Sequence, residues 1–177
     1  GQDIVLNHQS DLALRDTVLE ETGLAPDLRW PNDLLMGGKK CGGILTEMHA
    51  EPDRVHFVVV GIGVNVNHSS LPPEIAGIAT SLRMATGRTH SRLQIVARLL
   101  RKLESYYNLF LTEGPAPIVT RFNEVSSFAR GKRVRITSPT GSYVAVTEGL
   151  EPHGLLRVRR EDGSQDTVIS GDVAEAP

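Results

Sequence analysis

The chain of 177 residues is long enough for one hydrophobic core, or for one core with a small second domain. Its net charge of −2 argues against a nucleic-acid-binding surface over the whole molecule, and its single cysteine excludes an internal disulfide and fits a reducing cytosol. Its 40% hydrophobic and 23% charged residues are ordinary for a globular protein, and its longest apolar run, residues 57–64, is too short to span a bilayer.

The chain begins with helical sequence. Apolar residues recur through residues 4–22 and Gly23 follows as a stop, which predicts an amphipathic helix with a break near Ser10-Asp11. Because the chain opens on Gly1 instead of Met and runs almost directly into this helix, we expect it to be part of a longer protein.

Three strands are predicted next. Pro31 disfavours helix at Trp30, so residues 28–36 are predicted as a strand, and Gly37-Gly38 as a hairpin turn into a second strand at 43–49. Glu51-Pro52-Asp53 predicts another turn. A valine-rich strand at 55–60 and a loop at 61–67 follow. Short turns between successive strands predict antiparallel pairing.

The rest of the chain predicts helices and then a β domain. Residues 71–89 are mostly irregular, and helices are predicted at 91–111 and 117–128. Short alternating strands are then predicted at 132–137, 142–147, 155–160 and 167–169, as in a small SH3-like β-barrel that closes its sheet edges. We therefore predict an α+β fold with two domains. Residues 1–128 form a mixed, largely antiparallel sheet with packed helices, and residues 129–177 form the barrel.

Glycine is concentrated in one part of the chain. Six of the 17 glycines lie between Gly37 and Gly63, so the backbone there turns sharply or approaches another group closely. Lys40 follows the glycine turn, where its ammonium can meet phosphate or carboxylate oxygens, whereas Lys39 is interpreted as solvated. Together with the neighbouring amides and carboxylate, these residues predict a binding site for an anionic, adenylate-like ligand.

Several side chains near these glycines have two interpretations that the residues alone leave open. Asp33 positions a metal-bound phosphate, orients Lys40, or forms a turn. Asn32 and Asn65 offer donors and acceptors to ribose or adenine, or bond the local backbone. Trp30, the single tryptophan, is a core residue or a platform for a ligand.

The histidines and the cysteine give no reactive site. Five histidines show no metal-ligand spacing and are interpreted as surface or structural residues: His49, His56, His68, His90 and His153. Cys41 follows two lysines that would lower its pKa, but no neighbouring base is apparent, so we do not predict a thiol nucleophile.

Two segments together resemble one enzyme family. The sequences RWPNDLLMGGKKCGGILTE and VVVGIGVNVNH resemble the catalytic domain of biotin protein ligases. The pattern of that family is Lys/Arg-Trp-Pro-Asn-Asp, then Lys-x-Ala/Gly-Gly-Ile-Leu-x-Glu, then Gly-Ile-Gly-x-Asn-Val. Residues 79–82, the helix from Ser91 and residues 169–173 resemble the family more weakly. The resemblance implies the fold of biotin and lipoate ligases, which is similar to that of class II synthetases.

The resemblance implies a two-step, ATP-dependent reaction in the cytoplasm. Biotin and ATP give biotinyl-5′-AMP and pyrophosphate, and a lysine of a biotin carboxyl carrier domain of a biotin-dependent carboxylase then takes the biotin as an amide. Mg²⁺ is implied as a companion of ATP near Asp33, without a ligand cluster of its own. A homodimer is a further implication, since the family often dimerises. No nucleic acid or membrane is expected as a partner.

The same matching implies roles for individual residues. Lys40 and Asp33 are implied as catalytic, with Lys40 contacting the biotin carboxyl group and the phosphate. The implied biotin site consists of Lys40, Gly42, Gly43, Ile44 and Leu45. The implied nucleotide site consists of Arg29, Trp30, Asn32 and Asn65. Many members of the family have lysine where this chain has Arg29.

One part of the family pattern does not occur in the 177 residues. This part is a Gly-Arg-Gly-Arg-type loop that closes over biotin and nucleotide, so the activity of this chain alone is left open. Two alternatives remain beside the biotin ligase: a lipoate-type ligase of the same fold, and a binding module without catalysis. The motif set favours biotin over lipoate, and biotinyl-AMP affinity without turnover would favour the binding module.

Overall fold

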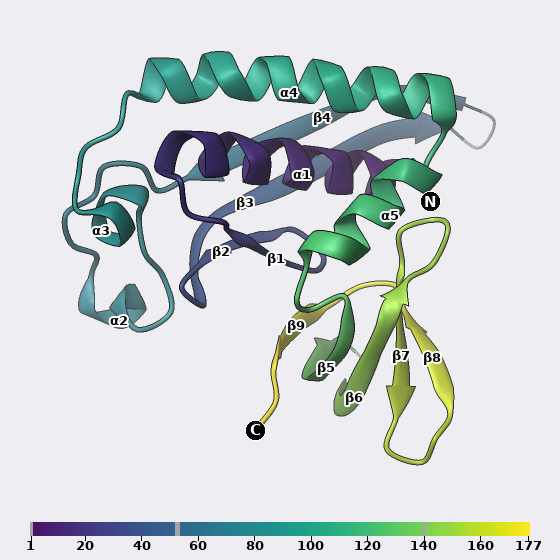
Figure 1. The fold of residues 1–177 in the computed structure, drawn as a ribbon. Coiled ribbons are helices and arrows are strands. Elements are labelled where there is room, and N and C mark those ends of the chain that lie inside the picture. Colours follow the sequence, from purple (N-terminus) through teal and green to yellow (C-terminus); the bar gives the residue numbers. More distant parts are fainter. Residues whose placement is uncertain (1, 52–53, 140) are drawn as a thin grey trace.

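A computed structural model of the chain describes residues 2–51, 54–139 and 141–177 (Figure 1). The helices are α1 (Gln2–Thr22), α2 (Pro73–Ala76), α3 (Leu82–Thr86), α4 (Arg92–Glu113) and α5 (Ala116–Val125). The strands of the first sheet are β1 (Asp27–Arg29), β2 (Asp33–Met36), β3 (Lys39–Glu51) and β4 (Arg54–Val64). The strands of the second sheet are β5 (Arg130–Ser138), β6 (Gly141–Leu150), β7 (Leu156–Arg160), β8 (Gln165–Val168) and β9 (Asp172–Glu175).

The first sheet has the strand order β1-β2-β3-β4, and each neighbouring pair is antiparallel, as predicted. The prediction of one strand over residues 28–36 is wrong, because this segment forms a hairpin of β1 and β2. Pro31 lies in the turn between them, where its missing N–H costs no ladder hydrogen bond. Gly37 and Gly38, with φ of +57° and +77°, form the predicted turn into β3. The predicted turn at Pro52-Asp53 lies outside the described residues.

Strands β3 and β4 are longer than predicted, which changes where the site residues lie. β3 begins at Lys39 instead of residue 43, so Lys40 belongs to a strand and not to a loop. β4 continues to Val64, so Gly61 and Gly63 also lie within a strand. Main-chain pairing between the two long strands accounts for this extension, since ladder hydrogen bonds need no side chains and outweigh the weak strand preference of glycine.

Helix α1 lies between the first sheet and α4 (Figure 1). The predicted helix is present, but it has no break near residue 10 and no polar face. Because a helix covered on all sides has no solvent-facing stripe, polar positions are buried beside apolar ones. The buried polar residues of α1 are Asn7, His8, Gln9, Ser10, Asp11, Arg15 and Thr17. None of the helices within the described residues is both long and apolar enough to cross a bilayer.

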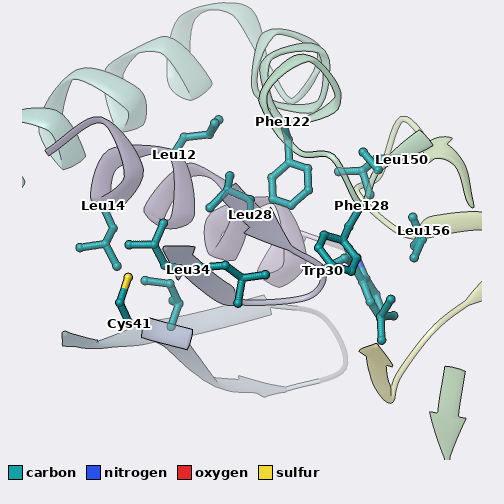
Figure 2. Close-up of a cluster of buried hydrophobic side chains, with 14 of the residues drawn as sticks. Leu12, Leu14, Leu28, Trp30, Leu34, Cys41, Phe122, Phe128, Leu150 and Leu156 are labelled. Carbon is teal, nitrogen blue, oxygen red and sulfur yellow. The ribbon is translucent and has the colours of Figure 1, made fainter. Parts of the chain in front are cut away.

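The second sheet has the strand order β8-β7-β6-β5-β9 and is antiparallel throughout. The predicted C-terminal β domain is therefore present, with β9 as an additional strand. Its buried side chains join the core beneath α1, as Figure 2 shows for Leu150 and Leu156 beside Trp30 and Phe128. One hydrophobic cluster thus extends from the first sheet to the second and fixes how they pack.

Candidate functional site

A cavity of about 600 Å³ lies over strands β3 and β4 of the first sheet. The residues that line it are Asn32, Lys40, Gly42, Gly43, Ile44, Leu45, Gly61, Ile62, Gly63, Asn65 and Ala79. Gly43 pairs with Gly63 across the two strands, and Leu45 pairs with Gly61, so much of the floor is bare backbone.

The side chains that flank this floor place the cavity on the face of the sheet that points away from α1. Ile44 is only 3% exposed, and a Cβ at Gly42 would lie 3.5 Å from Leu14 of α1, so these two positions face the helix. Successive residues of a strand point to opposite faces, and Leu45 is accordingly 62% exposed. The cavity therefore opens on the face that the helices leave uncovered.

The glycine at position 63 is not required by the fold. Its φ lies outside the left-handed range, and a Cβ built there would meet no atom within 4 Å. Substitution would therefore cost the backbone little, but the new side chain would project into the cavity. We infer that the missing side chain at Gly63 leaves room for a ligand.

A β-bulge in β3 determines which face Lys40 occupies. β2 pairs Leu34 with Gly42 and Leu35 with Lys40, so Cys41 is an extra residue in β3. In a regular strand, Lys40 would share the face of Gly42, beneath α1. The extra residue places Lys40 on the cavity face instead.

The segment after β4 fixes the backbone of Lys40 on its open side. The Lys40 N–H donates to the Ile78 carbonyl (2.9 Å), and the Lys40 carbonyl accepts from the Thr80 N–H (2.8 Å). This parallel bridge brings Ala79 to the edge of the cavity. The backbone position of Lys40 is thus held from both neighbouring segments, while its side chain remains half-exposed.

Lys40, Asp33 and Arg29 form a row of ion pairs beside the cavity. The Lys40 ammonium pairs with Oδ1 of Asp33. The Arg29 guanidinium donates to Oδ2 of the same carboxylate through Nε (3.2 Å) and Nη2 (2.6 Å). The row carries one negative and two positive charges, so it presents a net positive charge to an anionic ligand. The structure therefore brings together the two residues for which the family resemblance implies a catalytic role.

The donor set around Asp33 does not suit a metal ion held by the protein. Both carboxylate oxygens are engaged by cationic side chains, and a divalent ion would have to displace one of them against its charge. In the part of the chain that the structure describes, no group of three or more His, Cys, Asp or Glu side chains is arranged to hold a metal ion. A magnesium ion at this site would therefore depend on ligands from the nucleotide.

The two predicted amides both line the cavity, but each uses its amide nitrogen on nearby backbone. Nδ2 of Asn32 donates to the Ile44 carbonyl (2.7 Å), and Nδ2 of Asn65 donates to the Thr80 carbonyl (3.1 Å). Both side chains are therefore held in fixed orientations. Among the described residues neither Oδ1 accepts a hydrogen bond, so each amide offers an acceptor to ligand N–H or O–H groups.

The structure favours the core interpretation of Trp30 over that of a nucleotide platform. Trp30 is 1% exposed, its Nε1 donates to the Gly154 carbonyl (3.2 Å), and its ring belongs to the core (Figure 2). Arg29 was also predicted to bind nucleotide, but it is not among the cavity-lining residues and acts on Asp33 instead. Trp30 is thus a core residue, and Arg29 borders the site without lining it.

Cys41 is also a core residue. Burial raises the pKa of the Cys41 thiol to about 12, because the thiolate is disfavoured away from water. The idea that the adjacent lysines lower this pKa is therefore wrong, since the bulge turns Lys40 to the opposite face.

Ile62 and Ala79 line the cavity without having been predicted. The weak family resemblance at residues 79–82 was the one sequence signal for Ala79.

Two family profiles match the chain. The profile of the biotin/lipoate A/B protein ligase family matches residues 4–65, and that of the biotin protein ligase C terminal domain matches residues 130–174. The first match contains most of the cavity-lining residues, and the second contains nearly all of the second sheet.

Several known proteins that are similar to the chain are biotin ligases. A bifunctional ligase/repressor BirA from Bacillus spizizenii is 37% identical over 153 residues, which are 85% of this chain and 46% of that protein. A biotin–[acetyl-CoA-carboxylase] ligase from Paracoccus denitrificans is 30% identical over 166 residues, 90% of this chain and 68% of that protein. The biotin protein ligase from Aquifex aeolicus in complex with biotin and ATP shares the fold, with a TM-score of 0.82 at 24% identity over 97% of this chain and 70% of that chain. The chain spans about half the length of the Bacillus relatives it matches.

Proposed function

Because this chain belongs to the biotin protein ligase family, we propose that it serves ATP-dependent attachment of biotin to protein. In the first step an oxygen of the biotin carboxylate attacks the α-phosphorus of ATP. The bond to pyrophosphate breaks and biotinyl-5′-AMP forms. In the second step a lysine amine of a biotin carboxyl carrier domain attacks the biotinyl carbonyl, and AMP leaves.

The observation that carries this proposal is a fixed cation beside a glycine-floored cavity. Two anions must approach each other in the first step, and a positioned ammonium offsets their repulsion and the charge that develops on phosphorus. Lys40 projects to the cavity face, and the row it forms with Asp33 and Arg29 has a net positive charge. The bare backbone of Gly63 offers room for the ligand.

We assign the site residues by their place around the cavity. Lys40 contacts the carboxylate and the phosphate, and Gly42, Gly43, Ile44 and Leu45 contact biotin, as the family pattern implies. Asn32 and Asn65 face the adenylate with their free acceptors. Mg²⁺ would accompany the ATP phosphates, and no step is assigned to a protein-bound metal.

The remaining assignments concern the wider setting of the reaction. We propose a cytoplasmic enzyme that acts on the carrier domain of a biotin-dependent carboxylase, and a homodimer in keeping with the family. We place the domain boundary between residues 128 and 129. A lipoate-type ligase is the weaker alternative, because the match to the biotin protein ligase C terminal domain over residues 130–174 favours biotin.

The test is transfer of biotin to a purified carrier domain by the 177-residue chain, with ATP, Mg²⁺ and biotin supplied. Lys40→Ala should abolish labelling, whereas Lys39→Ala should not, because Lys39 points to the Ala76 carbonyl on the exposed side of the turn. Calorimetry with biotinyl-AMP is the second measurement. Binding without labelling would replace the ligase with a binding module, and absence of both would overturn the proposal.

A further inference from the structure

The side chain of Lys40 follows a narrow path across the backbone of Gly43. A Cβ built at Gly43 would lie 3.2 Å from Cε of Lys40 and 3.3 Å from Nζ. These separations are tighter than most contacts of a Cβ atom, so a side chain at residue 43 would force the end of Lys40 to shift by a few tenths of an ångström.

The end point of this path is Asp33, the cross-strand partner of Gly43. Oδ1 of Asp33 pairs with the Lys40 ammonium, and the two donors of Arg29 hold Oδ2. A carboxylate that accepts two hydrogen bonds from one guanidinium on the same oxygen cannot rotate freely, so its other oxygen keeps a fixed direction. Asp33 is also mostly shielded from water, with a side chain 15% exposed.

From these contacts we propose that Asp33 and Gly43 are positioning residues that hold the Lys40 ammonium at one point beside the cavity. Asp33 supplies the anchor, and Gly43 supplies the free space along the way. Neither residue needs to touch the reacting atoms through its side chain. The inference deepens the proposed function, on which its relevance to catalysis rests, but the position of Lys40 is testable without turnover.

Gly43→Ala is the sharper of two variants. The φ of Gly43 lies outside the left-handed range, and apart from Lys40 the atom nearest to the new methyl group would be the Asn32 carbonyl oxygen at 3.4 Å, an ordinary contact. The strand should therefore fold, and the flexible end of Lys40 should move away from Asp33. Asp33→Asn removes the anchor charge and keeps the shape of the side chain, so it should release Lys40 by a different route.

The measurement is competitive acylation of the folded chain with acetic anhydride, with Lys39 as the internal reference. Modification of Lys40 relative to Lys39 is read by mass spectrometry. We expect this ratio to rise about two- to fivefold in Gly43→Ala and in Asp33→Asn, the range set by the strength of partly exposed ion pairs. Because both variants free the same amine, the double variant should show no larger rise than the stronger single variant.

Gly77→Ala is the matched control. It is the same substitution at a position where a Cβ meets no atom within 4 Å and φ is ordinary, outside the cavity-lining set. Its acylation ratio should equal that of the unmodified sequence. An unchanged acylation ratio in Gly43→Ala, with native circular dichroism, would overturn the proposal. The proposal would also be overturned if the double variant raised the ratio by the product of the two single effects.

Kinetics separates this inference from the proposed function. If the unmodified chain releases pyrophosphate from ATP and biotin, Asp33→Asn should lower kcat more than it raises KM, because a misplaced cation acts mainly on the transition state. A predominant rise in KM would overturn the positioning role. If the chain shows no turnover, the proposed function fails, and the acylation ratios alone decide where Lys40 is held.

Discussion

Asp33 and Asp11 are two carboxylates on opposite sides of the first sheet, and their surroundings differ in kind. Asp33 faces the cavity side between two cations, Lys40 and Arg29. Asp11 lies in α1, is 2% exposed, and has the buried His8 imidazole at 3.6 Å as its neighbour. Burial raises the pKa of Asp11 to about 6, although His8 opposes this rise.

The comparison separates two uses of charge in one small protein. On the cavity side a charge excess is kept near water, where it remains available to a ligand. On the core side a single carboxylate is enclosed with a histidine, and its ionised form makes folding less favourable. Substitutions on the cavity side should therefore change chemistry with little effect on stability, and those on the core side should do the reverse.

The largest expected effect is that of Lys40→Ala on the cavity side. Loss of one positioned charge at a developing oxyanion typically lowers the rate by about 10²–10³-fold, and we expect that loss in biotinyl-AMP formation. The free energy of unfolding should change by less than about 1 kcal/mol, because the lost ion pair is half-exposed. Pyrophosphate release and urea unfolding give the two values.

If Lys40→Ala lowered the free energy of unfolding by well above about 1 kcal/mol, the separation between the cavity side and the core side would be contradicted. Lys39→Ala is the control in both measurements, since it removes a lysine from the adjacent position without touching Asp33.

The second effect concerns Asp11 and the dependence of stability on pH. The pKa of Asp11 in the folded chain, about 6, lies above the ordinary value of 3.8, so the folded state binds this proton more tightly than the unfolded state. Stability therefore falls as pH rises from about 4 to about 6, and this single group accounts for up to ~3 kcal/mol of the fall. Asp11→Asn should remove this contribution, so that the free energy of unfolding changes less between about pH 4 and about pH 6.

Urea unfolding at a series of pH values, followed by the fluorescence of Trp30, measures both profiles. Because other groups also titrate in this range, the informative quantity is the difference between the two chains. Parallel profiles for Asp11→Asn and the unmodified chain would show that the buried carboxylate does not control stability.

How far the sequence predicts the structure also differs between the two sides. On the cavity side, short-range patterns were sufficient for the Gly37-Gly38 turn and the antiparallel strands, whereas contact between Asp33 and Lys40 was one of three interpretations left open. The bulge at Cys41 was not predicted, because it depends on the register between β2 and β3, which no local pattern specifies. That one residue decides whether Lys40 faces the cavity or the core.

On the core side the sequence was a poorer guide. The polar residues of α1 suggested a solvent-facing stripe and a break, yet the helix is covered by the sheet and by α4. His8 was not singled out, although its Nε2 lies 2.8 Å from the Gly154 carbonyl, which belongs to the turn before β7. Contacts of this kind join residues almost 150 positions apart, so a local pattern cannot reveal them.

The smallest effect is expected for Trp30→Phe, which tests the interpretation of that residue as part of the core. The substitution removes the Nε1 donor to the Gly154 carbonyl but keeps an aromatic ring in the core, and His8 still reaches the same oxygen. Loss of this buried hydrogen bond should lower the free energy of unfolding by about 1 kcal/mol, measured by circular dichroism because the fluorophore is gone. Affinity for biotinyl-AMP should stay within about twofold, since Trp30 does not line the cavity. A tenfold loss of affinity at unchanged stability would instead place Trp30 in the ligand site, and the division between the cavity side and the core side would have to be redrawn at the turn between β1 and β2.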